Sequence, residues 1–237
     1  MLGQRSVRRS ASGEPRKRLR KVNSMTDEPA LSTERRKLQD ADLQRANIPE
    51  AFWRVKTNKV QEGKVRDLVF RYRREIVNML ATSSGVLFTG EEGVGKTSAA
   101  VCLLKEAMAA NFNCYFVTHT EIKELSSERF PSLYGSGADG ITVKRYIETA
   151  ELVVLDGFND FGDKEYGAIQ LEELLMRRAS QRLTTIMTTR SAETLRHQKN
   201  RTLYEAVTYC MVPVLIEGKN MRDEIRKEKD DRVKGRI

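Results

Sequence analysis

The chain contains the stretch Gly90-Glu91-Glu92-Gly93-Val94-Gly95-Lys96-Thr97, which fits the phosphate-binding pattern G-x-x-x-x-G-K-[ST]. Before it, residues 85–89 form the short apolar run GVLFT, which is typical of a buried strand. After it, residues 97–110 are rich in Ala, Leu and Met, which favour a helix. The sequence therefore predicts a strand, a phosphate-binding loop and a helix in succession.

The residue types of this loop suit the binding of a nucleotide with Mg²⁺. Glycines let the backbone turn its N–H groups toward a β-phosphate, and Lys96 adds a cationic donor for the β- and γ-phosphates. The hydroxyl of Thr97 is expected to ligate Mg²⁺ at the positive end of the following helix. The predicted ATP-binding residues are Gly90, Glu91, Glu92, Gly93, Val94, Gly95, Lys96, Thr97 and Ser98.

A second chemical motif is the run Leu152-Val153-Val154-Leu155-Asp156, in which four apolar residues end in an acid, as in a Walker B strand. In a parallel sheet Asp156 emerges at the carboxyl end of its strand, beside the phosphate-binding loop. We therefore predict that Thr97 and Asp156 form the Mg²⁺ site. Many hydrolysing P-loop enzymes have glutamate at the next position, where this chain has Gly157. We predict slow hydrolysis, with Asp160 as the candidate for orienting the attacking water.

The remaining pattern predicts an α/β fold. Four further runs have the length and composition of buried strands, namely residues 113–118, 151–155, 183–188 and 212–216. Helical spacing or composition is found in residues 65–80, 121–128, 141–149, 164–181, 192–197 and 203–209, whereas residues 131–140 are predicted to be a loop. Strands separated by helices predict a P-loop NTPase with a five-stranded parallel sheet covered on both faces.

Charge divides the chain into three predicted parts. The net charge is +9, and residues 1–24 hold eight Lys or Arg against the single acid Glu14. We predict a basic, largely disordered tail and partner-binding arm in residues 1–45, an ATPase domain in residues 46–222 and a charged tail in residues 223–237. Residues 1–24 could lie along nucleic-acid phosphates, form a solvated tail, target an organelle or precede a true start at Met25.

Cysteine spacing and hydropathy exclude other classes of protein. The three cysteines are far apart and form no C-x-x-C pair, so neither a disulfide framework nor a zinc site is indicated. No stretch has the roughly 18 uninterrupted apolar residues that a membrane span needs. We expect a cytoplasmic protein without a membrane partner.

Together these motifs resemble the AAA+ helicase loaders of the DnaC type and the related IstB transposition ATPases. Residues 46–52 (ANIPEAF) resemble the "gIPxxF" start of those domains, and residues 85–90 resemble their approach to the P-loop. Residues 115–122 resemble the second strand and helix, and residues 174–189 are similar to the segment that ends in the polar γ-phosphate sensor. Residues 218–222 (GKNMR) resemble the family's "GxSYR" element.

The resemblance implies roles for several polar residues. Thr188 or Thr189 takes the sensor role, and Arg190 stands where the family usually has asparagine. Arg222 is the candidate second sensor, and Arg201 is the candidate arginine finger, because Glu205 occupies the expected position of that finger. The predicted catalytic residues are Lys96, Asp156, Asp160, Thr189, Arg201 and Arg222.

The family also binds single-stranded DNA along a basic channel between the second strand and Walker B. The candidate DNA contacts here are Lys123, Arg129, Phe130, Lys144 and Arg145, with Tyr134 and Tyr146 as further stacking residues. For each lone basic residue, an ordinary solvated surface is the simpler explanation.

Three functions follow as hypotheses. The first is an ATP-switched protein of a bacterial or phage-infected cell, which self-associates through its ATP site and loads a hexameric replicative helicase onto single-stranded DNA. The second is an IstB-like regulator that binds double-stranded DNA and directs a transposase. The third is a nucleotide-dependent scaffold without hydrolysis, which Gly157 favours.

Overall fold

Five parallel strands form the centre of the fold. The computed structural model describes residues 35–57, 60, 64–126, 138–158, 165–193 and 201–223. The strands are β1 (Gly85–Thr89), β2 (Cys114–Thr118), β3 (Leu152–Asp156), β4 (Thr184–Thr188) and β5 (Met211–Leu215). Their order in the sheet is β2-β3-β4-β1-β5, and every neighbouring pair is parallel. This confirms the predicted five-stranded parallel sheet, with each strand within about one residue of its predicted bounds.

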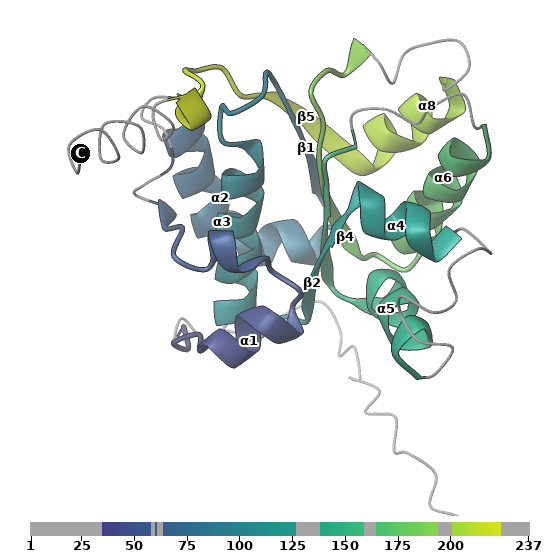
Figure 1. Ribbon diagram of the computed structural model, residues 1–237, viewed down its shortest axis with the longest axis horizontal. Helices are drawn as coiled ribbons and strands as arrows, with labels where there is room; N and C mark the ends of the chain where they lie inside the picture. The colour runs from purple at the N-terminus through teal and green to yellow at the C-terminus, as the bar shows by residue number, and fades with distance from the viewer. Residues whose placement is uncertain are drawn as a thin grey trace, which may run out of the picture. The chain divides into compact units, whose positions relative to one another are not determined.

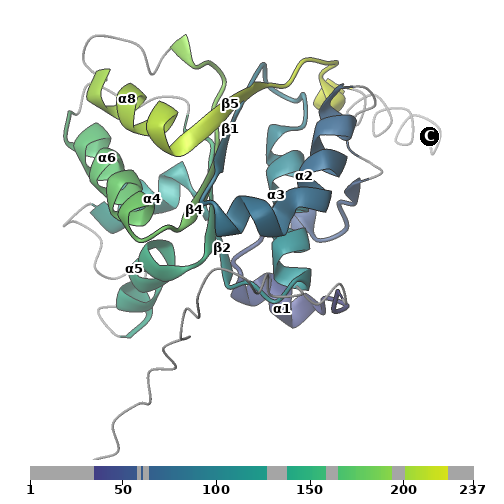
Figure 2. The same cartoon turned by 180° about the vertical axis from the view of Figure 1, so that it is seen from behind.

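Helices cover both faces of this sheet, as predicted. The helices are α1 (Asp40–Arg45), η1 (Glu50–Phe52), α2 (Lys64–Ala81), α3 (Lys96–Ala109), α4 (His119–Ser126), α5 (Ala138–Thr149), α6 (Glu165–Ser180) and α8 (Arg201–Cys210). Figures 1 and 2 show α1, α2 and α3 on one side of the sheet and α4, α5, α6 and α8 on the other. Parallel strands require such helical crossovers, because the chain must return from the end of one strand to the edge of the sheet where the next strand begins.

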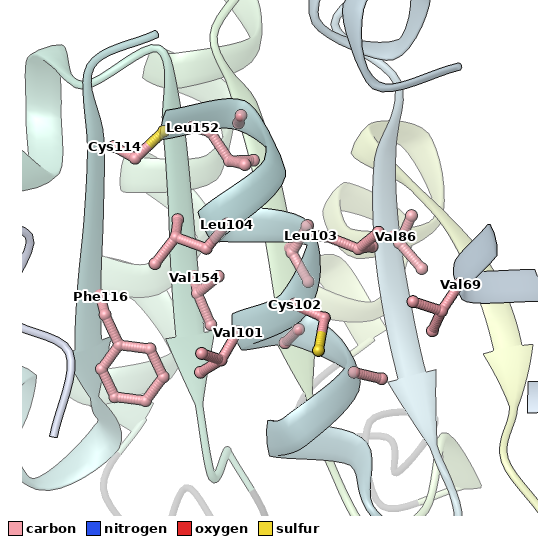
Figure 3. Packing of buried hydrophobic residues seen from close by; sticks show 14 of the residues in the cluster. Val69, Val86, Val101, Cys102, Leu103, Leu104, Cys114, Phe116, Leu152 and Val154 are labelled. Atoms are coloured by element: carbon pink, nitrogen blue, oxygen red, sulfur yellow. The ribbon is translucent and has the colours of Figure 1, made fainter. Parts of the chain in front are cut away.

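The alternation of side chains along each strand divides the core into two layers. Val86 and Phe88 of β1 pack with α2 and α3, whereas Leu87 between them packs with α6 and α8. Helix α3 is buried along most of its length, and Figure 3 shows Val101 and Leu104 turned toward β2 and β3. Because β1 is buried between β4 and β5 and α3 is packed on the sheet, the phosphate-binding loop that joins them is fixed at both ends.

Strand β5 is an edge strand and is only partly covered. Its central residue is Pro213, which lacks a backbone N–H and therefore suits an edge. Val212 and Leu215 are exposed, in contrast to the fully buried residues of β1 and β4.

Two local predictions differ from the structure. Residues 138–140 were predicted as part of a loop but form the first turn of α5. Residues 35–45 belong to the segment 1–45 that was predicted to be a largely disordered tail and partner-binding arm, yet Leu43 of α1 is buried in the layer that contains α2 and α3. The reason is a long-range contact, because the N–H of Phe116 in β2 donates to the carbonyl of Ala46 and holds this segment along the sheet edge.

Parts of the sequence predictions lie outside the described residues. These include the basic tail 1–24, the loop residues 131–137, the helical residues 194–197 and the C-terminal residues 224–237. No helix among the described residues is long and apolar enough to cross a membrane.

Candidate nucleotide-binding site

The loop between β1 and α3 has the backbone that a phosphate cradle requires. Gly93 and Gly95 have φ angles of +77° and +98°, which favour glycine. A Cβ atom on Gly93 would lie 1.8 Å from Oδ1 of Asn220, so a larger residue would also clash there. Gly95 is the N-cap of α3, and the helix begins at Lys96 with its free N–H groups at the loop.

Lys96 is held inside this loop by backbone carbonyls. Its Nζ donates to the carbonyl oxygens of Gly90 and Glu91, each at 2.6 Å. Burial lowers the pKa of Lys96, while the negative charges of Asp156, Glu91 and Glu92 act in the opposite direction. The ammonium group therefore lies among acidic groups at the position where the sequence pattern places a phosphate ligand.

The carboxylate of Asp156 joins three segments of the fold. Its Oδ1 accepts one hydrogen bond from the hydroxyl of Thr97 at 2.8 Å and one from the hydroxyl of Thr188 at 2.7 Å. Thr97 lies in the first turn of α3, Asp156 ends β3 and Thr188 ends β4. The structure thus brings the predicted Walker A and Walker B residues together at the carboxyl edge of the sheet.

This pair fits Mg²⁺ by its chemistry. A carboxylate and a hydroxyl are hard oxygen ligands, and Mg²⁺ typically takes one or two protein ligands together with phosphate oxygens and water. Among the residues that the structure describes, no group of three or more His, Cys, Asp or Glu side chains is arranged to hold a metal ion. Thr97 and Asp156 would therefore hold the ion together with the nucleotide rather than enclose it.

The two threonines at the end of β4 have different surroundings. The Thr188 hydroxyl bonds Asp156 and also accepts a hydrogen bond from the N–H of Gly157 at 2.9 Å. Thr189, the predicted sensor, is fully buried, and its hydroxyl points to the carbonyl of Ser191 at 3.4 Å. Thr188 is therefore the threonine that contacts the Walker residues.

The residues after Asp156 are only partly described. Gly157 has a φ of +80°, and the ring of Phe158 is buried against His119 at a centroid distance of 4.6 Å. Asp160, the candidate for orienting water, lies outside the described residues.

The C-terminal element lies against the phosphate-binding loop. The N–H of Met221 donates to the carbonyl of Gly93 at 3.0 Å, and the N–H of Arg222 donates to Oδ1 of Asn220 at 3.0 Å. Arg222, the predicted second sensor, is exposed and lies next to a residue that contacts the loop. Asn220 lies in the segment 218–222 that was matched to the "GxSYR" element, but only Arg222 of this segment was given a role, because the contact of Asn220 with Gly93 spans more than a hundred residues.

Arg201 lies at the start of α8, and its guanidinium pairs with Glu205 one turn later at 3.1 Å. Its side chain is 80% exposed. Since α8 ends where β5 begins, the start of α8 is on the carboxyl side of the sheet, where the P-loop also lies. An exposed arginine at this position could contact a neighbouring molecule.

The candidate DNA contacts are spread over the helices on one side of the sheet. Lys123 on α4 and Lys144 and Arg145 on α5 are exposed. Arg129 and Phe130, like Tyr134, lie outside the described residues. Tyr146 was considered as a stacking residue for bases, but its ring is stacked on Tyr115 with centroids 5.3 Å apart.

One prominent polar residue had no role in the sequence predictions. Arg178 of α6 is fully buried and donates to the hydroxyl of Thr185 and to the carbonyls of Ile147, Ala150 and Thr184 at 2.6–3.0 Å. Burial lowers its pKa to about 10, so the guanidinium stays charged at neutral pH. Its role is to join α5, α6 and β4.

Comparisons with known proteins support the fold. No protein-family model matches the chain, and a search of curated protein sequences finds no match. The crystal structure of the DnaC helicase loader is similar with a TM-score of 0.58 and 18% identity, over 71% of this chain and 100% of that one. A crystal structure of DnaI has a TM-score of 0.57 and 21% identity, over 73% and 93% of the two chains.

A third similar structure is the replication initiator DnaA bound to AMPPCP and single-stranded DNA. Its TM-score is 0.55 and its identity is 15%, over 75% of this chain and 54% of that one. The chain has the fold of the DnaC-type AAA+ domains. At these identities the likeness establishes the fold alone, and the activity has to be argued from the site.

Proposed function

We propose that this chain is an ATP-binding AAA+ protein of DNA replication that loads a replicative helicase onto single-stranded DNA. The observation that carries the proposal is the shared Oδ1 atom of Asp156, which bonds Thr97 of the P-loop and Thr188 of the sensor strand. Nucleotide binding is further supported by the DnaA structure with AMPPCP, and the loader role by the fold likeness to DnaC and DnaI.

The proposed chemistry assigns a role to each group at the site. Lys96 and the N–H groups at the start of α3 bind the phosphates, and Thr97 and Asp156 position Mg²⁺. Thr188 couples the end of β4 to Asp156, and Arg222 and Arg201 respond to the nucleotide of the same and of a neighbouring subunit. Single-stranded DNA lies along Lys123, Lys144 and Arg145, with Arg129 and Phe130 as further contacts.

Hydrolysis is proposed to be slow, because Gly157 offers no carboxylate next to Asp156. This feature also favours the second candidate, a nucleotide-dependent scaffold that does not hydrolyse ATP. ATP turnover measured with and without single-stranded DNA separates the two. Stimulated turnover would exclude the scaffold.

The test of nucleotide binding compares the wild type with Lys96→Ala. Loss of the ammonium group removes a charge-assisted bond to phosphate, so ATP affinity should fall by about tenfold or more. Arg74→Ala, which alters an exposed arginine of α2, is the matched control and should bind ATP like the wild type. Equal affinities of the Lys96→Ala variant and the wild type would contradict the proposed site.

The loader role is tested with the hexameric replicative helicase of the same cell. The full chain should co-purify with this helicase in the presence of Mg·ATP and increase its loading onto circular single-stranded DNA. Binding to double-stranded DNA and a transposase instead would support the IstB-like alternative.

A further inference from the structure

Arg190, two residues beyond β4, is fixed beside the phosphate-binding loop. Its carbonyl oxygen accepts a hydrogen bond from the N–H of Gly90, the first residue of the loop, at 3.0 Å. Its guanidinium forms an ion pair with the carboxylate of Glu92 inside the loop. Both the backbone and the side chain of Arg190 therefore contact the P-loop, although 98 residues separate Arg190 from Glu92.

Arg190 offsets part of the negative charge of the phosphate-binding loop. Glu91 and Glu92 occupy variable positions of the phosphate-binding pattern, and their carboxylates would repel a bound triphosphate. Arg190 neutralises one of these two charges. The charges of Glu91, Glu92, Asp156 and Arg190 all act on the pKa of Lys96, because these groups lie near its ammonium.

The ion pair is of a kind that phosphate can replace. The side chains of Arg190 and Glu92 are 56% and 49% exposed, so water screens their attraction. A terminal phosphate carries more charge than a carboxylate and accepts paired hydrogen bonds from a guanidinium. Glu92 therefore holds Arg190 near the loop without binding it strongly.

The position of Arg190 favours the γ-phosphate over the others. Thr188, two residues earlier, bonds Asp156, and this aspartate would hold the Mg²⁺ ion that neutralises the terminal phosphates. The end of β4 therefore lies at the terminal end of a triphosphate.

We propose that Arg190 binds the γ-phosphate in cis by exchanging Glu92 for that phosphate, and that this exchange sets the preference of the site for triphosphate over diphosphate. This inference rests on the proposed binding of ATP. Arg190 would supply within one subunit the charge that an arginine finger supplies from a neighbour.

The test measures the affinities of the full chain for fluorescent AMPPNP and fluorescent ADP, each with Mg²⁺. Arg190→Ala should lower the affinity for the triphosphate analogue by about tenfold and change the affinity for ADP by less than about twofold, because only the γ-phosphate loses a contact. Arg190→Lys, which keeps the charge but loses the paired donors, should recover only part of the loss. Arg74→Ala on α2 is again the control and should leave both affinities unchanged.

A double-mutant cycle tests the exchange itself. Glu92→Gln should increase triphosphate affinity by about threefold or more when Arg190 is present, because it both breaks the ion pair with the arginine and removes a repulsive charge. Most of this gain should vanish in the Arg190→Ala background. A gain of the same size in both backgrounds would overturn the exchange.

The outcomes separate this inference from the proposed function. A wild-type chain that binds neither nucleotide would overturn both. The role of Arg190 alone would be overturned if the wild type binds both nucleotides and Arg190→Ala lowers the two affinities equally or lowers neither.

Discussion

At Asp156, one carboxylate oxygen accepts hydrogen bonds from two threonines, and one of these threonines ends β4. We predict that Thr188→Val lowers ATP turnover by about 10- to 100-fold, since a hydrogen bond to a charged group contributes about 1.5–3 kcal/mol. The variant also leaves the N–H of Gly157 without its hydroxyl acceptor. Single-turnover hydrolysis of labelled ATP measures the effect.

Thr189→Val is the matched variant for this experiment. It removes a hydroxyl of the same type from the adjacent residue, whose hydroxyl makes one long bond among the described residues, to the carbonyl of Ser191. The effect on turnover should be the smaller of the two. A larger loss in Thr189→Val would favour Thr189 over Thr188 for the sensor role that the sequence resemblance implies for one of the two.

At the scale of elements, the packing of α5 and α6 against β4 depends on Arg178, which links the last turn of α5 to β4. Among the described residues its buried guanidinium bonds no carboxylate, and carbonyl groups at the negative end of the α5 dipole balance its charge. Arg178→Met keeps most of the volume but leaves buried carbonyls unsatisfied, so it should lower the free energy of unfolding by about 3–5 kcal/mol.

Urea unfolding at neutral pH measures this loss, with Arg177→Ala as the control. Arg177 is adjacent in sequence, but its side chain is 53% exposed and pairs with Glu148 at the surface. Its removal should change the free energy of unfolding by less than about 1 kcal/mol. Equal losses in the two variants would show that Arg178 does not join the elements.

The success of sequence-based prediction also depends on the element considered. Strands β1 and β3 were predicted correctly because each is a short apolar run next to a motif with fixed spacing. Helix α1 was not recognised as part of the core, since its one buried residue, Leu43, is isolated in a charged sequence and finds its partners at a distance. The first turn of α5 was missed because Gly140 signals a loop, whereas the helix is held by packing on the sheet.

The contacts of the candidate site also divide into those that the sequence predicts and those that it does not. Lys96, Thr97 and Asp156 could be predicted because their motifs are local and the topology of a parallel sheet brings their ends together. The contacts of Asn220 with Gly93 and of Arg190 with Glu92 could not, because they join segments about a hundred residues apart with no shared pattern. The assignment of catalytic roles stays a prediction for the experiments described above.

For the whole molecule, the remaining prediction concerns self-association. The P-loop, Asp156 and the start of α8 all lie at the carboxyl edge of one sheet, and Arg201 extends from α8 with a weak local partner in Glu205. We predict that Mg·ATP increases the mass of the particle and that Mg·ADP does not, because only a γ-phosphate would attract an arginine from a neighbouring subunit. Analytical ultracentrifugation of the full chain measures the mass.

Arg201→Ala separates assembly from nucleotide binding. The variant should stay monomeric with Mg·ATP, while its affinity for ATP as a dilute monomer matches that of the wild type, since Arg201 bonds only an exposed glutamate of its own helix among the described contacts. Glu205→Gln breaks the same pair but keeps the arginine, so it should assemble at least as well as the wild type. ATP-dependent assembly that persists in Arg201→Ala would mean that another residue bridges the subunits, and assembly that is lost equally in Glu205→Gln would assign the interface to the ion pair rather than to the arginine.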